Sequence, residues 1–151
     1  MDPQTWMREA VALARANVTA GGRPFGALLV RDGQVLARAA NGIHLDHDPT
    51  AHAELLAIRA ACTQLGSPRL DGAVVYASGH PCPMCLAAMH LCGIGEAWFA
   101  YSNEDGEPFG LSTAAVYAQM ARPPSEQDGL RLRPLRPEGE QGLYEDWVAR
   151  R

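Results

Sequence analysis

The fold is decided by the stretch Ala73-Val74-Val75-Tyr76-Ala77 and, a few residues later, Pro83-Met84-Cys85-Leu86-Ala87-Ala88-Met89-His90-Leu91-Cys92. The first part is short and apolar, which predicts a strand buried on both faces of a sheet. The second part is apolar over a helical length and is closed by Gly93, which predicts a helix. Residues 96–101 (Glu-Ala-Trp-Phe-Ala-Tyr) predict a further strand. Strands that alternate with helices indicate an α/β fold.

The rest of the chain adds helices and strands on both sides of this unit. Asp2-Pro3 predicts the start of a helix that ends at Gly21-Gly22, because an N-cap residue is followed by proline at the first helical position. Asp32-Gly33 predicts a tight hairpin between strands 26–31 and 34–38. We expect Thr50 to be the N-cap of a helix over 51–65, while the segment 41–49 is polar.

Downstream, we expect a helix over 113–120, a short strand over 130–133 and a last helix over 143–150. The segments 103–108 and 122–125 are expected to be connections within one domain over 1–151. The element order predicts a three-layer α/β/α fold, with helices on both faces of a mixed five-stranded sheet.

Composition excludes several classes of protein. Of the 151 residues, 47% are hydrophobic and 20% are charged, which is typical of a globular domain rather than a disordered chain. The net charge of −4 gives no general attraction to phosphate backbones. No apolar run is long enough to span a bilayer, and residues 1–5 do not resemble the start of a signal peptide. We therefore expect a cytoplasmic protein without a membrane partner.

Two of the four cysteines, Cys82 and Cys85, are spaced to bind a metal. Residues at i and i+3 lie on the same side of a first helical turn, and the helix dipole there favours thiolates. His52 lies at the start of the other predicted helix and would complete three protein ligands. Two thiolates and an imidazole suit zinc, and three protein ligands leave one position for water, as in catalytic zinc sites. The pattern predicts a catalytic zinc.

Glu54 follows His52 by two residues and is expected to be the proton carrier. Zinc makes a water molecule reactive at neutral pH, and a nearby carboxylate can move its protons. His-x-Glu followed by Pro-Cys-x-x-Cys resembles the signature of zinc deaminases. This resemblance implies attack of the water on a ring carbon that bears an exocyclic amine, with release of ammonia.

Other interpretations of these residue types stay open. The Cys82–Cys85 pair could be a redox pair or part of a structural zinc site, although no second pair exists. The remaining histidines and cysteines are expected to be structural, as are the aromatic residues of strand 96–101, which are expected in the core. These residues are His44 and His47 in a solvated loop, His90 on a helix flank, Cys62 and Cys92 as small buried side chains, and Trp98, Phe99 and Tyr101.

The motifs resemble the cytidine deaminase-like zinc superfamily, in the branch of guanine deaminases and tRNA adenosine deaminases. They are His47-Asp48-Pro49-Thr50-Ala51-His52-Ala53-Glu54, Pro81-Cys82-Pro83-Met84-Cys85 and Pro24-Phe25-Gly26-Ala27. The resemblance implies that His52, Cys82 and Cys85 hold one zinc ion per chain and that Glu54 shuttles protons. It also implies that Asn41 hydrogen-bonds the substrate, with Phe25, Ala53 and His80 as further substrate contacts. Such proteins are typically homodimers.

Four segments are more similar to guanine deaminases: 24–26, 82–85, 110–122 and 143–147. The last helix contains Glu145 and Asp146, whereas tRNA-editing relatives usually have a basic one. We therefore expect a free nucleobase as substrate, guanine first, and no nucleic-acid partner. The alternatives are a tRNA adenosine deaminase, a deaminase of another amino-purine, amino-pyrimidine or amino-triazine, and a catalytically silent zinc-fold subunit. The intact Glu54 argues against the silent subunit.

Three departures from the guanine deaminase pattern concern the substrate. His80 stands where this branch usually has Glu, the segment Gly110-Leu111-Ser112-Thr113 lacks an acidic residue, and the chain ends soon after Trp147. Guanine presents N–H donors that a carboxylate accepts well. One hypothesis is that His80 helps to define a substrate other than guanine. The other is that His80 points to solvent and the substrate is set elsewhere.

Overall fold

The computed structural model describes residues 2–151, and the chain divides into two units, Met1–Ala118 and Gln119–Arg151. The first unit contains a four-stranded sheet in the order β2-β1-β3-β4. β1 pairs antiparallel with β2 and with β3, and β3 pairs parallel with β4. The strands are β1 (Gly26–Arg31), β2 (Gln34–Ala40), β3 (Val74–Gly79) and β4 (Glu96–Tyr101). A single domain over 1–151 stays a prediction.

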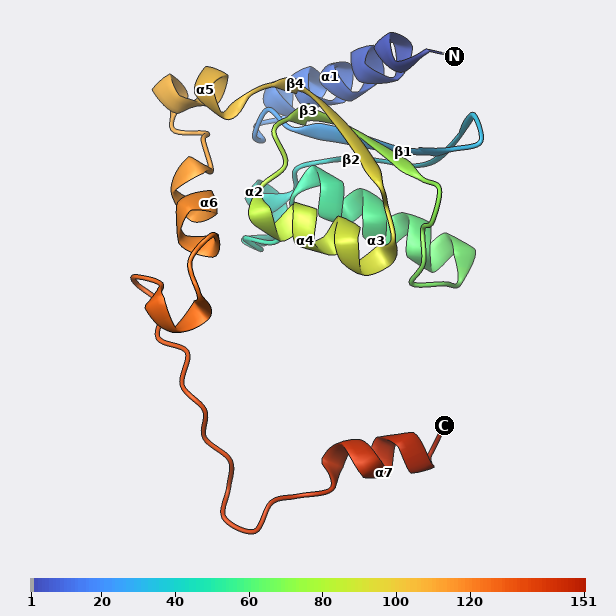
Figure 1. Ribbon diagram of the computed structural model, residues 1–151. Helices are drawn as coiled ribbons and strands as arrows, with labels where there is room; N and C mark the ends of the chain where they lie inside the picture. Colours follow the sequence, from blue (N-terminus) through green and yellow to red (C-terminus); the bar gives the residue numbers. More distant parts are fainter. Residues whose placement is uncertain (1) are drawn as a thin grey trace. The chain divides into compact units, whose positions relative to one another are not determined.

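Helices cover both faces of this sheet, as predicted. Figure 1 shows α1 (Pro3–Thr19) on one face and α3 (Ala53–Leu65) with α4 (Pro83–Cys92) on the other. The short helices are α2 (Ile43–Asp46), α5 (Asn103–Gly106), α6 (Ala114–Met120) and α7 (Leu143–Ala149), with 3-10 turns at Glu107–Phe109 and Pro124–Glu126. The α/β architecture with a mixed sheet is therefore confirmed.

The two faces of β1 bury different side chains, because neighbours along a strand point to opposite sides. Leu28 and Val30 pack with Trp6 of α1. Leu29 packs in the other cluster, with Ala57 and Ile58 of α3. Leu28 and Leu29 are fully buried, as expected for β1, which is one of the two inner strands of the sheet.

The prediction of a fifth strand over 130–133 is wrong. This segment has no regular structure, and its leucines, Leu130 and Leu132, are exposed. Alternating apolar residues favour a strand only where another strand can pair with them, and none in the described part of the chain does so. β4 is therefore an edge strand of the sheet.

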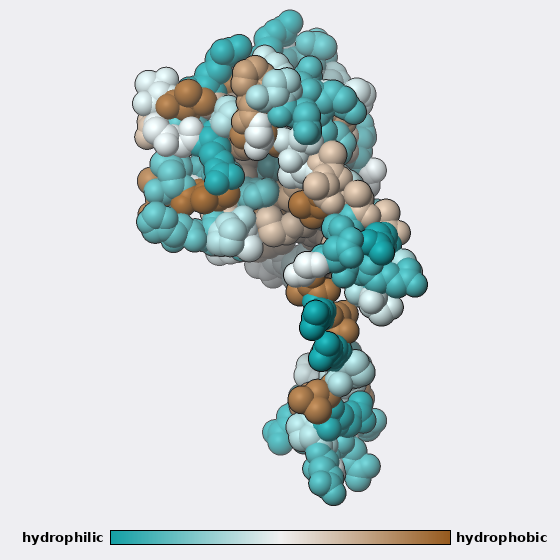
Figure 2. All heavy atoms as spheres, turned by 90° about the vertical axis from the view of Figure 1, so that its left-hand side faces the viewer, coloured by the Kyte–Doolittle hydropathy of each residue, from teal (hydrophilic) through white to brown (hydrophobic). Residues whose placement is uncertain are grey.

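The edge position of β4 also overturns the expectation that its aromatic residues lie in the core. Trp98, Phe99 and Tyr101 are 46%, 45% and 52% exposed. Figure 2 shows apolar side chains at the surface among hydrophilic ones. In the unit Gln119–Arg151, the exposed apolar residues include Leu135, Leu143, Tyr144 and Trp147. No helix of residues 2–151 is long and apolar enough to cross a membrane.

The expected helix over 51–65 begins two residues later than predicted. Its N-cap is His52, not Thr50. Thr50 instead donates from its backbone N–H and its hydroxyl to Asp48, at 2.8 and 2.7 Å, which forms a turn before the helix. The short helix α2 lies within the segment expected to be loop. The Asp32-Gly33 hairpin is confirmed, since both residues have positive φ angles.

Candidate metal centre and active site

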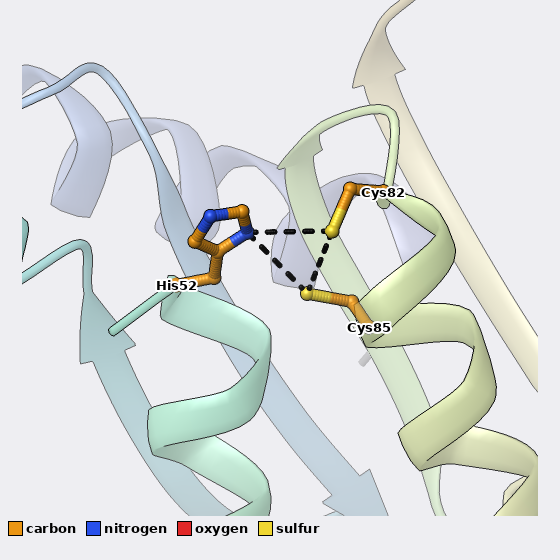
Figure 3. Close-up of side chains that lie close together, drawn as sticks. All are labelled: His52, Cys82 and Cys85. Atoms are coloured by element: carbon orange, nitrogen blue, oxygen red, sulfur yellow. Dashed lines mark hydrogen bonds between the residues drawn. The ribbon is translucent and has the colours of Figure 1, made fainter. Parts of the chain in front are cut away.

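Three candidate metal ligands meet where two helices begin. His52 is the N-cap of α3, Cys82 is the N-cap of α4, and Cys85 lies one turn into α4. His52 Nδ1 lies 3.5 Å from Cys82 Sγ and 3.6 Å from Cys85 Sγ, and the two sulfur atoms are 3.6 Å apart. Figure 3 shows the three side chains pointing toward one another. Pro83 at the first helical position of α4 favours this start of the helix.

The spacing of the three atoms fits zinc. With Zn–S distances of about 2.3 Å and a Zn–N distance of about 2.0 Å, a tetrahedral ion would separate its ligands by about 3.5 Å (S to N) and about 3.8 Å (S to S). The observed separations lie within 0.2 Å of these values. Two sulfurs and one imidazole also match the ligand preference of zinc. His52, Cys82 and Cys85 are thus positioned to bind one zinc ion.

The electrostatics of the cysteine pair favour metal binding. The hydrogen bond with Cys85, and then the one with His52, hold the pKa of Cys82 well below its ordinary value. The bond between the two cysteines raises the pKa of Cys85, and burial raises it further. The pair therefore already stabilises one thiolate, at a helix start whose dipole also favours negative charge.

Glu54 lies beside these ligands but is not one of them. It occupies the first turn of α3 and is only 7% exposed. Burial raises the pKa of its carboxyl, while the charge of His52 and a hydrogen bond with Cys85 act in the opposite direction. A buried carboxyl next to a metal site is suited to proton transfer, because its raised pKa lies closer to neutral pH.

Asn41 and Phe25 lie next to each other, as the resemblance suggested for two substrate contacts. The Asn41 N–H donates to the Phe25 carbonyl at 3.0 Å. The Asn41 side-chain Oδ1 accepts from the N–H of Ile43 at 3.0 Å, and the residue is 3% exposed. Since Oδ1 is already engaged, the side-chain NH₂ is the group of Asn41 that can donate to a ligand.

Ala53 and Phe25 occupy tightly fitted positions. The Ala53 side chain is fully buried, and as the first residue of α3 it has an N–H without an acceptor inside the helix. Phe25 lies against Gly79, where an added Cβ would be 2.9 Å from Phe25 Cε1. Glycine at position 79 therefore allows the Phe25 ring to pack on the end of β3.

His80 is held between aromatic side chains, not simply pointed at solvent. The backbone N–H of His80 donates to the backbone carbonyl of Tyr101 at 2.8 Å. Its ring centroid lies 4.7 Å from that of Phe99 and 5.3 Å from that of Tyr117. Its Nδ1 lies 2.9 Å from the Pro81 carbonyl oxygen.

Tyr117 is a residue of the site that the sequence did not single out. Its hydroxyl donates to the Pro81 carbonyl, one residue before Cys82. Burial raises its pKa to about 12, and the nearby charges of Cys82, Cys85 and Glu54 act in the same direction. The only available signal was a tyrosine within the predicted helix 113–120, and that pattern does not tell which face meets the site.

A cavity of about 800 Å³ lies next to part of this site. Phe25 and His80 line it together with α1 and the segment that follows β4. Asn41, Glu54 and the three metal ligands do not line it. The candidate residues therefore form two groups, one around the metal ligands and one at the cavity wall.

The other histidines and cysteines stand apart from the metal ligands. His47 and His90 are exposed, and Cys92 is buried, as expected. Cys62 is only half-buried. His44 lies in α2, and its Nδ1 is buried without a hydrogen-bond partner, so its assignment to a solvated loop is wrong.

Comparisons with known proteins agree with this geometry. Residues 1–101 match the family model of the cytidine and deoxycytidylate deaminase zinc-binding region. Guanine deaminase of Bacillus subtilis is 39% identical over 84% of this chain and 82% of its own length. The tRNA-specific adenosine deaminase of the same organism is 38% identical over 68% of this chain and 64% of its own.

Solved structures extend the likeness to the fold. The crystal structure of Bacillus subtilis guanine deaminase superposes with a TM-score of 0.90 at 34% identity, and covers 99% of this chain and 95% of that one. A structure of guanine deaminase from Nitrosomonas europaea gives a TM-score of 0.70 at 27% identity, over 87% of this chain and 69% of that one. The chain belongs to the cytidine and deoxycytidylate deaminase zinc-binding family, whose zinc site fits His52, Cys82 and Cys85.

Proposed function

We propose that this protein is a zinc-dependent guanine deaminase, which hydrolyses guanine to xanthine and ammonia. The main support is its likeness to Bacillus subtilis guanine deaminase, at 39% identity over most of both chains and with a TM-score of 0.90. The tRNA-specific adenosine deaminase of Bacillus subtilis matches a smaller part of this chain. The net charge of −4 also favours a small substrate over RNA.

The metal ligands and the carboxyl have separate tasks in this reaction. His52, Cys82 and Cys85 hold the zinc, which when bound makes a water molecule reactive at neutral pH. Glu54 takes a proton from the attacking water on its carboxylate oxygen and passes it to a ring nitrogen. It then takes the remaining proton of the hydroxyl added at the ring carbon and delivers it to the 2-amino group, which leaves as ammonia as the carbonyl forms. Its burial keeps bulk water from competing for these protons.

The substrate base is held by groups near the metal. The side-chain NH₂ of Asn41 donates to an acceptor on the base, because its Oδ1 is occupied by Ile43. The N–H of Ala53 offers a second donor at the start of α3. Phe25 and His80 contribute apolar and polar contacts at the rim.

We also propose that the protein works as a homodimer in the cytoplasm, with no nucleic-acid partner. The support is the family resemblance together with the absence, in residues 2–151, of a helix that could cross a membrane. Sedimentation analysis of the zinc-loaded protein tests the dimer.

Ammonia release from a panel of substrates tests the proposed function. The panel contains guanine, adenine, cytosine, their nucleosides, ammeline and an anticodon stem-loop with adenosine. Zinc-loaded protein is compared with Glu54→Ala as the blank. We expect guanine to be turned over fastest. Faster, salt-sensitive turnover of the stem-loop would replace this function with tRNA editing, and turnover of another base would replace guanine as the substrate.

A further inference from the structure

The side-chain amide of Asn17 joins the end of α1 to two other segments of the chain. Asn17 lies in the last turn of α1, and its Nδ2 donates to the carbonyl of Arg23 at 2.7 Å and to that of Asn41 at 2.9 Å. We propose that Asn17 is a positioning residue of the active site, which holds Asn41 in the orientation that binds the substrate base. The inference rests on the proposed function, because it concerns how that site keeps its substrate contact in place.

The hydrogen bonds of Asn17 belong to a closed ring. The Phe25 N–H donates to the Arg23 carbonyl at 2.8 Å, so this oxygen accepts from both the backbone and Asn17. The Asn41 N–H in turn donates to the Phe25 carbonyl at 3.0 Å. The Asn17 amide closes the ring, because it also donates to the carbonyl of Asn41. One side chain therefore restrains the segments that carry both Phe25 and Asn41.

The amide of Asn17 is not needed to end α1. Backbone N–H groups of the residues that follow already donate to the carbonyls of Ala16, Asn17 and Val18. Both hydrogens of the Asn17 NH₂ are instead donated outside the helix. A carboxylate or an apolar side chain of the same size would offer neither donor. The amide thus serves the neighbouring segments rather than the helix.

Gly22 provides the space that this amide occupies. A Cβ at position 22 would lie 2.5 Å from Asn17 Nδ2 and would also clash with the ring of His44. The φ angle of Gly22 is not positive, so the need for glycine at this position comes from space and not from backbone conformation. The loop after α1 leaves room for the Asn17 side chain.

The restrained backbone of Asn41 is linked to the metal centre. The N–H of Gly42 donates to the carbonyl of Ala51 at 2.9 Å, and Ala51 precedes the metal ligand His52. Asn41 Oδ1 is held by the N–H of Ile43. Its NH₂ has no hydrogen-bond partner among residues 2–151, and it is not one of the buried side-chain atoms there that lack a partner. The NH₂ of Asn41 is therefore fixed in direction and open to a ligand.

Kinetics of Asn17→Asp test the positioning role. The variant keeps the size of the side chain but cannot donate to the two carbonyls. We expect it to raise KM for guanine about tenfold and to change kcat less than about threefold, because Glu54 and the metal ligands are untouched. Asn17→Ala should have the same effect without adding a charge. A fall in kcat at unchanged KM, as expected from loss of folded enzyme alone, overturns the inference.

Ala16→Asp is the matched control for the charge. It places the same carboxylate in the same turn of α1, at an exposed position outside the ring of hydrogen bonds. Its KM and kcat should equal those of the wild type. A rise in KM as large as that of Asn17→Asp would assign the effect to charge and contradict the positioning role.

A double substitution tests whether Asn17 acts through Asn41. The side-chain amide that Asn17 positions is absent from Asn41→Ala. In that background Asn17→Asp should lower kcat/KM less than about threefold, against about tenfold in the wild-type background. Equal reductions in both backgrounds would show that Asn17 acts independently of Asn41, against the inference.

Amide hydrogen exchange measured by NMR tests the restraint without substrate. In the zinc-loaded protein, the N–H groups of Asn41 and Ile43 report on the two ends of the Asn41 residue that are held by hydrogen bonds. We expect both to exchange about tenfold faster in Asn17→Asp, while the hydrogen-bonded N–H of Leu70, in another part of the fold, keeps its rate. Unchanged rates at Asn41 and Ile43 would refute the restraint. If the wild type does not turn over guanine, the proposed function fails, and the exchange rates still decide whether Asn17 holds Asn41.

Discussion

Glu54→Gln separates proton transfer from zinc binding. The substitution keeps the size of a side chain that is 7% exposed and replaces only its ionisable oxygen with an amide. The three metal ligands are His52, Cys82 and Cys85, so the variant should bind zinc as the wild type does. It should lose most of its turnover, because an amide cannot take up and release the protons of the reaction.

The size of the effect follows from the position of Glu54. A positioned general acid or base contributes roughly 10²- to 10⁴-fold to a rate, which corresponds to about 3 to 5 kcal/mol of activation free energy. We expect Glu54→Gln to lower kcat on guanine by a factor within that range. The folding free energy should change little, because no salt bridge of Glu54 is lost among the described residues and the side-chain volume is kept.

Stopped and continuous ammonia assays measure the turnover of the variant, and metal analysis of the purified protein measures its zinc content. Glu9→Gln makes the same chemical change on α1, where Glu9 pairs with Arg38 at the surface, and should keep full activity. Loss of zinc from Glu54→Gln would show that Glu54 is a ligand. Turnover within threefold of the wild type would show that another group moves the proton.

Three other substitutions test the metal site, the substrate contact and the packing. Cys85→Ala should remove most of the zinc and lower the free energy of unfolding by about 3 kcal/mol at saturating zinc. Metal analysis measures the zinc content, and urea denaturation with and without a chelator measures the stability. A zinc content equal to that of the wild type would contradict the ligand assignment. Asn41→Asp keeps the acceptor for the N–H of Ile43 but removes the NH₂ donor, so KM for guanine should rise roughly 10- to 100-fold in steady-state kinetics; an unchanged KM would exclude the donor role. Gly26→Ala would place its Cβ 2.5 Å from the Ala10 carbonyl oxygen and should lower the free energy of unfolding by about 1 to 3 kcal/mol. Gly95→Ala, with nothing within 4 Å of its Cβ, should leave the stability unchanged. Equal denaturation midpoints for the two variants would show that α1 can shift.

Much of the fold could be predicted because local signals and the global arrangement agree. The Asp32-Gly33 turn, the N-cap Asp2 and the glycines that end α3 and α4 each determine one local conformation. The metal ligands were also predictable, since Cys82 and Cys85 are one helical turn apart. His52 was predicted as the third ligand because it lies at the start of another predicted helix, and the structure shows that the starts of α3 and α4 lie close together.

The errors concern properties that depend on distant neighbours. The 130–133 segment alternates like a strand, but a strand requires a partner, which local sequence does not reveal. The exposure of Trp98 on β4 follows from that same missing neighbour. Tyr117 was not predicted because its role depends on which face of α6 meets Pro81, 36 residues earlier in the chain.

The most direct test of this account is the product balance for guanine with protein of known zinc content. We predict that zinc-loaded protein forms xanthine and ammonia in equal amounts. Protein stripped of metal should form neither product, and added zinc should restore both. A folded, zinc-loaded protein that leaves guanine unchanged would contradict the proposed function.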